Sequence, residues 1–159
     1  MGMTPEAFRR VMSKFATGVT IVTVRNNQEI HGLTVNAFTS VSLEPPLVLI
    51  CIKKNGQSHE HLSAADGFVV NILSAGQEEL AMRFANSALS SEERFAGVRY
   101  RPNAAGIPVL EGVLGHLGCR ISERFDGGDH TIFLGKVEET GVNDGLRPLL
   151  FYESGFHTL

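Results

Sequence analysis

Residues 34–42 (TVNAFTSVS) are the segment whose side chains are best suited to bind a ligand. Hydroxyl and amide groups are concentrated there, between two apolar segments of the chain. One interpretation is a half-buried strand whose side chains alternate between two faces. The other is that the hydroxyls, the Asn36 amide and free backbone N–H groups bind a polar ligand, because buried polar groups without partners are costly. The residues alone leave both interpretations open.

Two further places carry groups that could contact a ligand. Lys53 and Lys54 follow an apolar segment and precede Ser58. Either they are a solvated charge pair, or one lysine, Ser58 and the amides of the following helix bind a phosphate. His130 follows Asp129 at the start of a predicted strand, where the carboxylate could orient the imidazole ring. A lone histidine is more often structural, so its role also stays open.

Several other kinds of chemistry lack their motifs. The sequence has no His-x-x-x-His or Cys-x-x-Cys, and His59 and His61 cannot share a helix face, so we expect no metal site. It has no nucleophile elbow, no phosphate-binding P-loop, and no Gly-x-Gly-x-x-Gly after a strand. The two cysteines, Cys51 and Cys119, are expected to be buried free thiols.

The elements that must position these residues are mostly strands. Segment 19–24 is β-branched, segment 47–52 is a continuous apolar run, and Asn26-Asn27 is a turn signal. Strands are expected at residues 19–24, 30–36, 47–52, 68–73, 115–123, 130–138 and 148–156.

Three helices are expected around these strands. The first starts at Thr4-Pro5-Glu6 and ends before Gly18, with an apolar stripe at residues 8, 11, 12 and 15. The second is capped by Ser58 and extends to Ala65, and the third covers residues 77–86 with Leu80, Ala81 and Phe84 inward. Residues 86–110 form a long, partly helical excursion. A mainly β fold follows, a closed or nearly closed antiparallel barrel with peripheral helices.

Length and charge narrow the classes of protein. The chain has 159 residues, which suits a single domain over residues 1–159. Lys and Arg number 14 against 17 Asp and Glu, a net charge of −3, which argues against a nucleic-acid binder or a polybasic membrane anchor. No apolar run reaches the roughly 18 residues of a membrane span, and no secretory signal is recognised, so we expect a cytoplasmic protein.

In this order, the motifs of the chain resemble those of the flavin reductase family, whose fold is an FMN-binding split β-barrel of antiparallel Greek-key type. The resemblance extends over nearly the whole chain, and its most specific part is residues 34–46 together with Gly-Asp-His at 128–130. The other matching segments are GVTIVT at 18–23, FVVNIL at 68–73, Phe84-Ala85, Arg94-Phe95, Gly106-Ile107-Pro108 and Pro148-Leu149. Ala37 departs from the family, because many relatives carry Ser there.

The resemblance implies which residues bind the flavin. It places Asn36, Ser40, Val41 and Ser42 at the isoalloxazine ring and makes Ala37 a further flavin-binding residue. Thr34, Cys51, Lys53, Ser58 and His59 would hold the ribityl chain and phosphate, and Phe84 and Ala85 would approach the flavin from the third helix. His130 would lie near the nicotinamide as the proposed catalytic residue, with a positioning role.

The implied reaction is hydride transfer from NADH or NADPH to N5 of FMN, or of FAD or riboflavin. The implied partners are a second copy of the chain and a flavin-dependent monooxygenase that receives the reduced flavin. The alternative function is a non-catalytic flavin-binding or sensor module on the same barrel. An enzyme similar to pyridoxamine-phosphate oxidases would want more Arg and Lys around the phosphate than Lys53 and Lys54.

Overall fold

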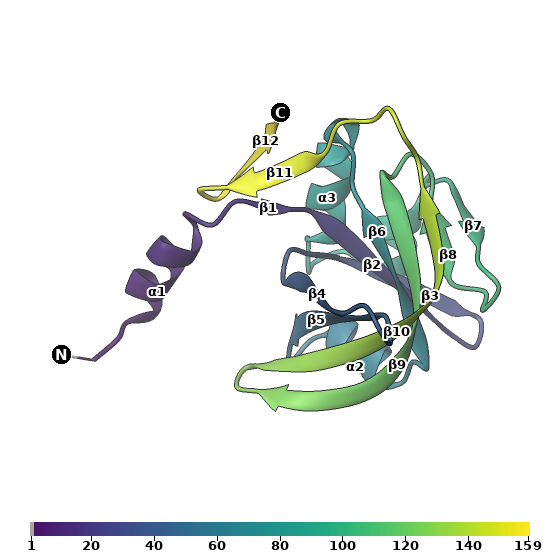
Figure 1. Ribbon diagram of the computed structural model, residues 1–159, viewed down its shortest axis with the longest axis horizontal. Coiled ribbons are helices and arrows are strands. Elements are labelled where there is room, and N and C mark those ends of the chain that lie inside the picture. The colour runs from purple at the N-terminus through teal and green to yellow at the C-terminus, as the bar shows by residue number, and fades with distance from the viewer. Residues whose placement is uncertain (1) are drawn as a thin grey trace.

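Most strands belong to one seven-stranded antiparallel sheet in the computed structural model, which describes residues 2–159 (Figure 1). The order in the sheet is β3-β2-β6-β9-β10-β5-β4. Its strands are β2 (Thr20–Asn26), β3 (Glu29–Val35), β4 (Phe38–Ser42), β5 (Leu47–Lys53), β6 (Gly67–Ile72), β9 (Gly115–Gly127) and β10 (His130–Val142). The sheet curls until β3 contacts β5, so it forms a nearly closed barrel. The expected mainly β, antiparallel fold is confirmed.

Two smaller sheets complete the strands. One joins β1 (Thr17–Gly18), β11 (Leu149–Tyr152) and β12 (Gly155–Thr158), and the other pairs β7 (Tyr100–Pro102) with β8 (Pro108–Leu110). The expectation of one strand over residues 148–156 is wrong, because the chain turns at Glu153 and Ser154. Both of these residues have a positive φ, of 48° and 61°.

Residues 2–159 contain four α-helices where three were expected. They are α1 (Pro5–Met12), α2 (Gln57–Ser63), α3 (Glu78–Phe84) and α4 (Ser91–Phe95), and a 3₁₀ turn, η1 (Ala75–Gln77), precedes α3. The prediction that Ser58 caps α2 is wrong: Gly56 is the N-cap, and Ser58 lies inside the first turn. Within the excursion at 86–110, α4 begins with a capping box between Ser90 and Glu93.

The barrel interior is filled by alternate residues of its strands. In β5, Val48, Ile50 and Ile52 are buried, while Leu49 and Cys51 between them are half-buried. Cys51 is therefore not the buried thiol that was expected, whereas Cys119 is buried. A second core packs α3 against β2, with Ala81 and Phe84 facing inward as predicted. The alternation gives β5 one face toward the core and one face available to a ligand.

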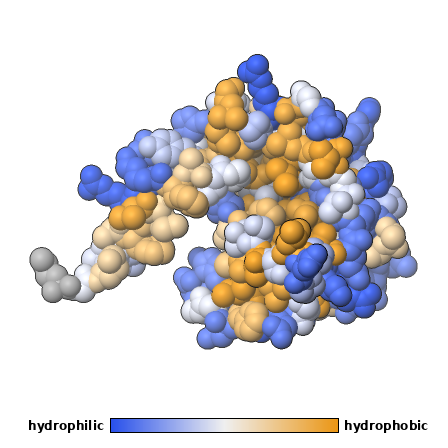
Figure 2. Space-filling model, in the orientation of Figure 1, coloured by the Kyte–Doolittle hydropathy of each residue, from blue (hydrophilic) through white to orange (hydrophobic). Residues whose placement is uncertain are grey.

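Helix α1 stands away from the barrel as an arm (Figure 1). Its start is as predicted, because the Thr4 side chain accepts a hydrogen bond from the backbone of Ala7 at 3.1 Å. The apolar stripe covers no part of the barrel: Phe8, Val11, Met12 and Phe15 are 59%, 71%, 49% and 70% exposed. Apolar surface on the arm is visible in Figure 2. Within residues 2–159, no helix is long and apolar enough to cross a membrane.

The base of the arm is tied to the turn between β11 and β12. Lys14 forms an ion pair with Glu153, and the Glu153 N–H donates to the carbonyl of Ser13 at 2.9 Å. These contacts fix where the arm leaves the barrel and leave its apolar stripe uncovered.

Candidate functional site

The polar segment at residues 34–42 contains the end of β3, a two-residue connection, here called the crossing, and the whole of β4. Strand β3 ends at Val35, β4 starts at Phe38, and Asn36 and Ala37 lie exposed between them. A single half-buried strand over this segment is therefore wrong. The crossing and β4 present most of their side chains to solvent at the edge of the sheet.

A β-bulge interrupts β4 in the middle of its hydroxyl-bearing residues. Ser40 pairs with Val48 and Ser42 pairs with Leu47, so Val41 has no partner in the ladder. A bulge leaves the extra residue unpaired and re-aims its neighbours. At 48% exposure, Val41 adds an apolar side chain between two hydroxyls. This combination of apolar surface, hydroxyls and unpaired backbone suits a flat heteroaromatic ring with polar edges.

A second polar group lies at the other end of β5. Lys53 is directly opposite His130 in the pairing of β5 with β10. Lys54 is already paired with Asp126, and its N–H donates to the carbonyl of Asp129 at 2.9 Å. Lys53 lies six residue steps after Leu47, a rise of about 20 Å along the strand. The two polar groups therefore mark the ends of an elongated site, with Cys51 between them.

Helix α2 brings two more of the predicted residues to the Lys53 end. The Nε2 atom of His59 lies 2.8 Å from the hydroxyl of Thr131, which is opposite Ile52 in the ladder. Ser58 is half-buried, and its hydroxyl contacts His31. His59 thus packs near the end of β5 on the face of Ile52, whereas the side chain of Lys53, the next residue, lies on the opposite face with His130.

His130 is oriented by its neighbour, as the sequence suggested. Its Nδ1 atom lies 2.7 Å from Oδ1 of Asp129, and this hydrogen bond lowers the pKa of the Asp129 carboxyl. The register places His130 beside Lys53 and away from the bulge at Val41.

The predicted residues near α3 fall into two groups. The Thr34 hydroxyl donates to the carbonyl of Ala81 at 2.6 Å, which ties β3 to α3. Ala85 is exposed at the end of α3. The Phe84 ring is fully buried against Phe95, so it has no surface to offer a ligand.

A buried polar cluster beneath Ser58 was missed by the sequence reasoning. His31, in β3, is completely buried, with Nε2 at 2.8 Å from the Ser58 hydroxyl and Nδ1 at 2.7 Å from the Ser91 hydroxyl. Its ring stacks on that of His61 at 4.3 Å. Burial, with smaller contributions from His61 and Arg94, lowers the pKa of His31 to about 3, so its ring is neutral at pH 7. A lone histidine in a strand gives no sequence signal of such a cluster.

Arg94 completes this cluster from α4. It is only 3% exposed, and it donates to the carbonyls of Gly32 at 2.7 Å and Asn86 at 3.0 Å. One of its terminal nitrogens lies 3.5 Å from Nε2 of His31. Within residues 2–159, no carboxylate pairs with Arg94, and its Nε atom has no hydrogen-bond partner.

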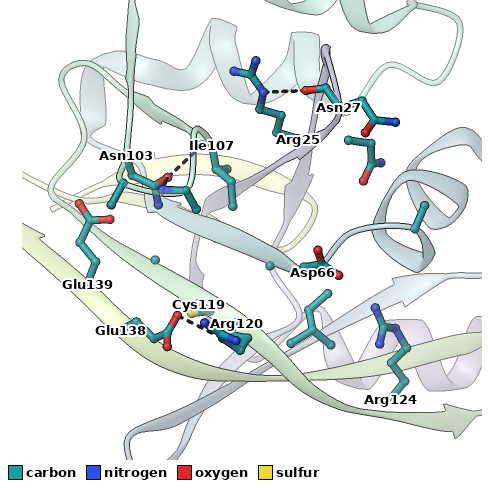
Figure 3. A pocket seen from close by; sticks show the side chains of 17 residues that line it. Arg25, Asn27, Asp66, Asn103, Ile107, Cys119, Arg120, Arg124, Glu138 and Glu139 are labelled. Atoms are coloured by element: carbon teal, nitrogen blue, oxygen red, sulfur yellow. Dashed lines mark hydrogen bonds and ion pairs between the residues drawn. The ribbon is translucent and has the colours of Figure 1, made fainter.

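A separate cavity of about 930 Å³ contains none of the predicted site residues (Figure 3). Its arginines already have partners: Arg25 donates to the carbonyl of Asn27, Arg120 pairs with Glu138, and Arg124 donates to the carbonyl of Ala65. In the part of the chain that the structure describes, no three His, Cys, Asp or Glu side chains are grouped to hold a metal ion. The site on β4, β5 and α2 is therefore the stronger candidate.

Known proteins match this chain over almost its full length. The family model "Flavin reductase like domain" matches residues 12–159. The NADH-dependent flavin reductase of a Rhodococcus species is 38% identical, over 99% of this chain and 88% of the relative. The reductase subunit HsaB of a flavin-dependent monooxygenase of Mycobacterium tuberculosis is 36% identical, over 96% of this chain and 81% of the relative.

A solved structure extends the match to the fold. The NADH:FAD oxidoreductase SgcE6 of Streptomyces globisporus superposes with a TM-score of 0.92 and 40% identity, over 100% of this chain and 97% of the other. The match in sequence and the match in fold agree, and the chain belongs to the flavin reductase family.

Proposed function

We propose that the protein binds a flavin along β5, with the ring at the bulge of β4 and the phosphate end near Lys53 and Ser58. The protein is an oxidoreductase that reduces the flavin with NADH or NADPH. The observation that carries the placement is the alignment of two polar groups along one strand, about 20 Å apart. Such a spacing suits an elongated ligand that is aromatic at one end and anionic at the other.

The described residues fit a flavin by their chemistry. Ser40, Val41 and Ser42 offer hydroxyls, an apolar contact and the unpaired backbone of the bulge. Lys53 is exposed and forms no ion pair within residues 2–159, so its charge is available to a phosphate. The full proposed set is Thr34, Asn36, Ala37, Ser40, Val41, Ser42, Cys51, Lys53, Ser58, His59 and Ala85. Phe84 is left out of this set because its side chain is fully buried. We propose that Ala85, the next residue, contacts the flavin instead.

In this reaction the protein mainly binds the flavin and the nicotinamide dinucleotide and orients them toward each other. A flavin supplies the hydride-accepting chemistry when bound. Backbone N–H groups at residues 40–42 would stabilise the negative charge that develops on reduction, and orientation lowers the entropic cost of transfer. We assign no proton-transferring residue to the hydride step. His130, held by Asp129, is proposed to position the nicotinamide dinucleotide.

The protein supplies reduced flavin to a monooxygenase. We base this on the relative that is named the reductase subunit of such an enzyme. FMN and FAD both remain candidate flavins, because the bulge and the Lys53 end would bind parts that the two share. The non-catalytic flavin-binding alternative is not supported, since the matched relatives are named reductases or an oxidoreductase.

We further propose that two copies form a homodimer through α1. Phe8, Val11 and Met12 of this helix and Phe15, three residues beyond its end, are each at least 49% exposed. An apolar stripe of this kind on an anchored arm marks a protein interaction site. A second copy is the occupant we favour, because it would cover both stripes at once by symmetry. We treat residues 1–159 as one domain, and the free thiols favour a cytoplasmic location.

The activity is tested by following nicotinamide absorbance with the purified protein, NADH or NADPH, and FMN, FAD or riboflavin in turn. We expect steady oxidation that depends on the added flavin. The variant that tests the flavin site is Ser40→Ala with Ser42→Ala, which removes both hydroxyls beside the bulge and is expected to raise the KM for flavin about tenfold. Flavin binding without any nicotinamide oxidation would contradict the proposed activity.

A further inference from the structure

Arg94 is a buried cation without a counter-ion among residues 2–159. Arg94 is only 3% exposed, and the two backbone groups that accept hydrogen bonds from it are neutral carbonyls. A buried charge is costly unless an opposite charge or strong hydrogen bonds compensate it. The unpartnered Nε atom shows that the compensation inside the chain is incomplete. An anion bound nearby would supply the missing part.

His31 connects this cation to the proposed flavin site. The terminal nitrogen of Arg94 lies 3.5 Å from Nε2 of His31, and Nε2 lies 2.8 Å from the hydroxyl of Ser58. On the other side of the ring, Nδ1 is held by Ser91 at 2.7 Å. Stacking on His61 and full burial leave the His31 ring no freedom to turn. The Ser58 hydroxyl is therefore fixed from behind by a rigid, neutral imidazole.

We propose that His31 and Arg94 are positioning residues that prepare Ser58 to bind the flavin phosphate, so that the protein selects phosphorylated flavins over riboflavin. The inference rests on the proposed placement of the flavin along β5. His31 fixes the hydroxyl of Ser58, and Arg94 provides a positive charge behind it. Lys53, at the end of β5, provides the charge on the exposed side.

A purely structural role for the cluster predicts a different result. The same hydrogen bonds attach α2 and α4 to β3, and losing them for that reason alone would weaken every flavin equally. A role in reading the phosphate affects only ligands that carry one. FMN and riboflavin differ by this one group, so their affinities separate the two roles.

Two substitutions of His31 divide its two contacts. The amide of glutamine reaches the position of Nε2, so His31→Gln can keep the contact with Ser58. The shorter His31→Asn reaches only the position of Nδ1, so it can keep the contact with Ser91 and loses the one with Ser58. The pair is matched in chemistry, and Ser58→Ala removes the hydroxyl directly.

The dissociation constants of FMN and riboflavin are measured by flavin fluorescence titration, without turnover. We expect Ser58→Ala and His31→Asn to weaken FMN about tenfold, the loss of one hydrogen bond to a charged group, and to change riboflavin less than about twofold. His31→Gln should keep FMN within about threefold of the wild type. Adding His31→Asn to Ser58→Ala should change the FMN constant no further, because His31 acts through Ser58.

Equal weakening of both ligands by His31→Asn would overturn the inference and leave a structural cluster. Equal affinity of the wild-type protein for FMN and riboflavin would also overturn it, while the proposed flavin reduction would stand. Failure of the wild type to bind either flavin would instead remove the proposed function itself. Circular dichroism checks that each variant is folded. If His31→Asn does not fold, His31→Gln decides the case, because equal weakening of FMN and riboflavin by it would overturn the inference.

Discussion

His130 is the residue whose proposed role is most sharply constrained by its position. It is paired with Asp129 at 2.7 Å and lies opposite Lys53, at the far end of β5 from the bulge. If it positions the dinucleotide, His130→Ala should raise the KM for NADH about tenfold and lower kcat by less than threefold, since no proton transfer depends on it.

The same steady-state assay can contradict the proposed role of His130. A raised KM for FMN with an unchanged KM for NADH would move His130 to the flavin phosphate, and a large loss of kcat at constant KM would give it a chemical role. His157→Ala is the control, because this exposed histidine lies on β12, and its ring contacts Tyr152 of β11, far from His130 in the chain. It should leave all three constants unchanged.

Single residues differ in how much their type reveals. Ser40 and Ser42 could be predicted to be accessible, because hydroxyls so close together are seldom all buried. His31 and Arg94 could not be assigned, since the same residue types are usually solvated and only the packing of β3, α2 and α4 buries them. Phe84 is a different case: the family pattern places it at the ligand, and the structure packs its ring in the core.

At the scale of elements, Gly32 controls how closely α3 and α4 approach β3. A Cβ at this position would lie 2.7 Å from Phe84 and 3.3 Å from Phe95, and the Gly32 carbonyl also accepts from Arg94. Gly32→Ala should lower the free energy of unfolding by about 1–3 kcal/mol, as overpacking does. Urea unfolding followed by circular dichroism measures this change.

Gly18→Ala serves as the matched control in β1. A Cβ there meets nothing within 4 Å, so we expect a change below about 0.5 kcal/mol. Equal stability of the two variants would show that β3 can move away from α3, contrary to the close contact of Gly32 with Phe84.

Elements were predictable where one local signal dominates. The apolar run at 47–52 became β5, and Thr4 with Pro5 gave the start of α1. The end of the chain was missed because the turn depends on two non-glycine residues, Glu153 and Ser154, in a conformation that their types do not announce.

At the scale of the whole molecule, we propose that the arm, α1, joins two copies of the chain into a dimer. Phe8→Ser with Val11→Ser places two polar side chains in its exposed apolar stripe. We expect the wild type to have a mass in solution of twice 17.3 kDa and the double variant to have 17.3 kDa. Size-exclusion chromatography with light scattering measures both masses.

Arg10→Ser is the control for this experiment. Arg10 lies on the same helix but on the side away from the apolar stripe, so a dimer should persist. A wild-type mass of 17.3 kDa would reject the dimer and leave the apolar stripe without an explanation.

Overall architecture was predictable as a class, but its pairings were not. Short strands and turns indicate an antiparallel barrel, yet nothing local says that β6 pairs with both β2 and β9. The site depends on such pairings, because Lys53 and His130 are neighbours only through the ladder of β5 with β10. Long-range register is set by packing of the whole core, which no short segment encodes.

The bulge at Val41 also affects how the molecule behaves toward others of its kind. Strand β4 is an outermost strand, and a regular outermost strand invites chains to add to it and build fibrils. The β-bulge at Val41 bends this edge strand, so that another strand cannot pair with it regularly. The same bulge therefore has two consequences. It leaves hydrogen-bonding groups free for a small molecule, and it reduces the tendency of the protein to aggregate through this edge.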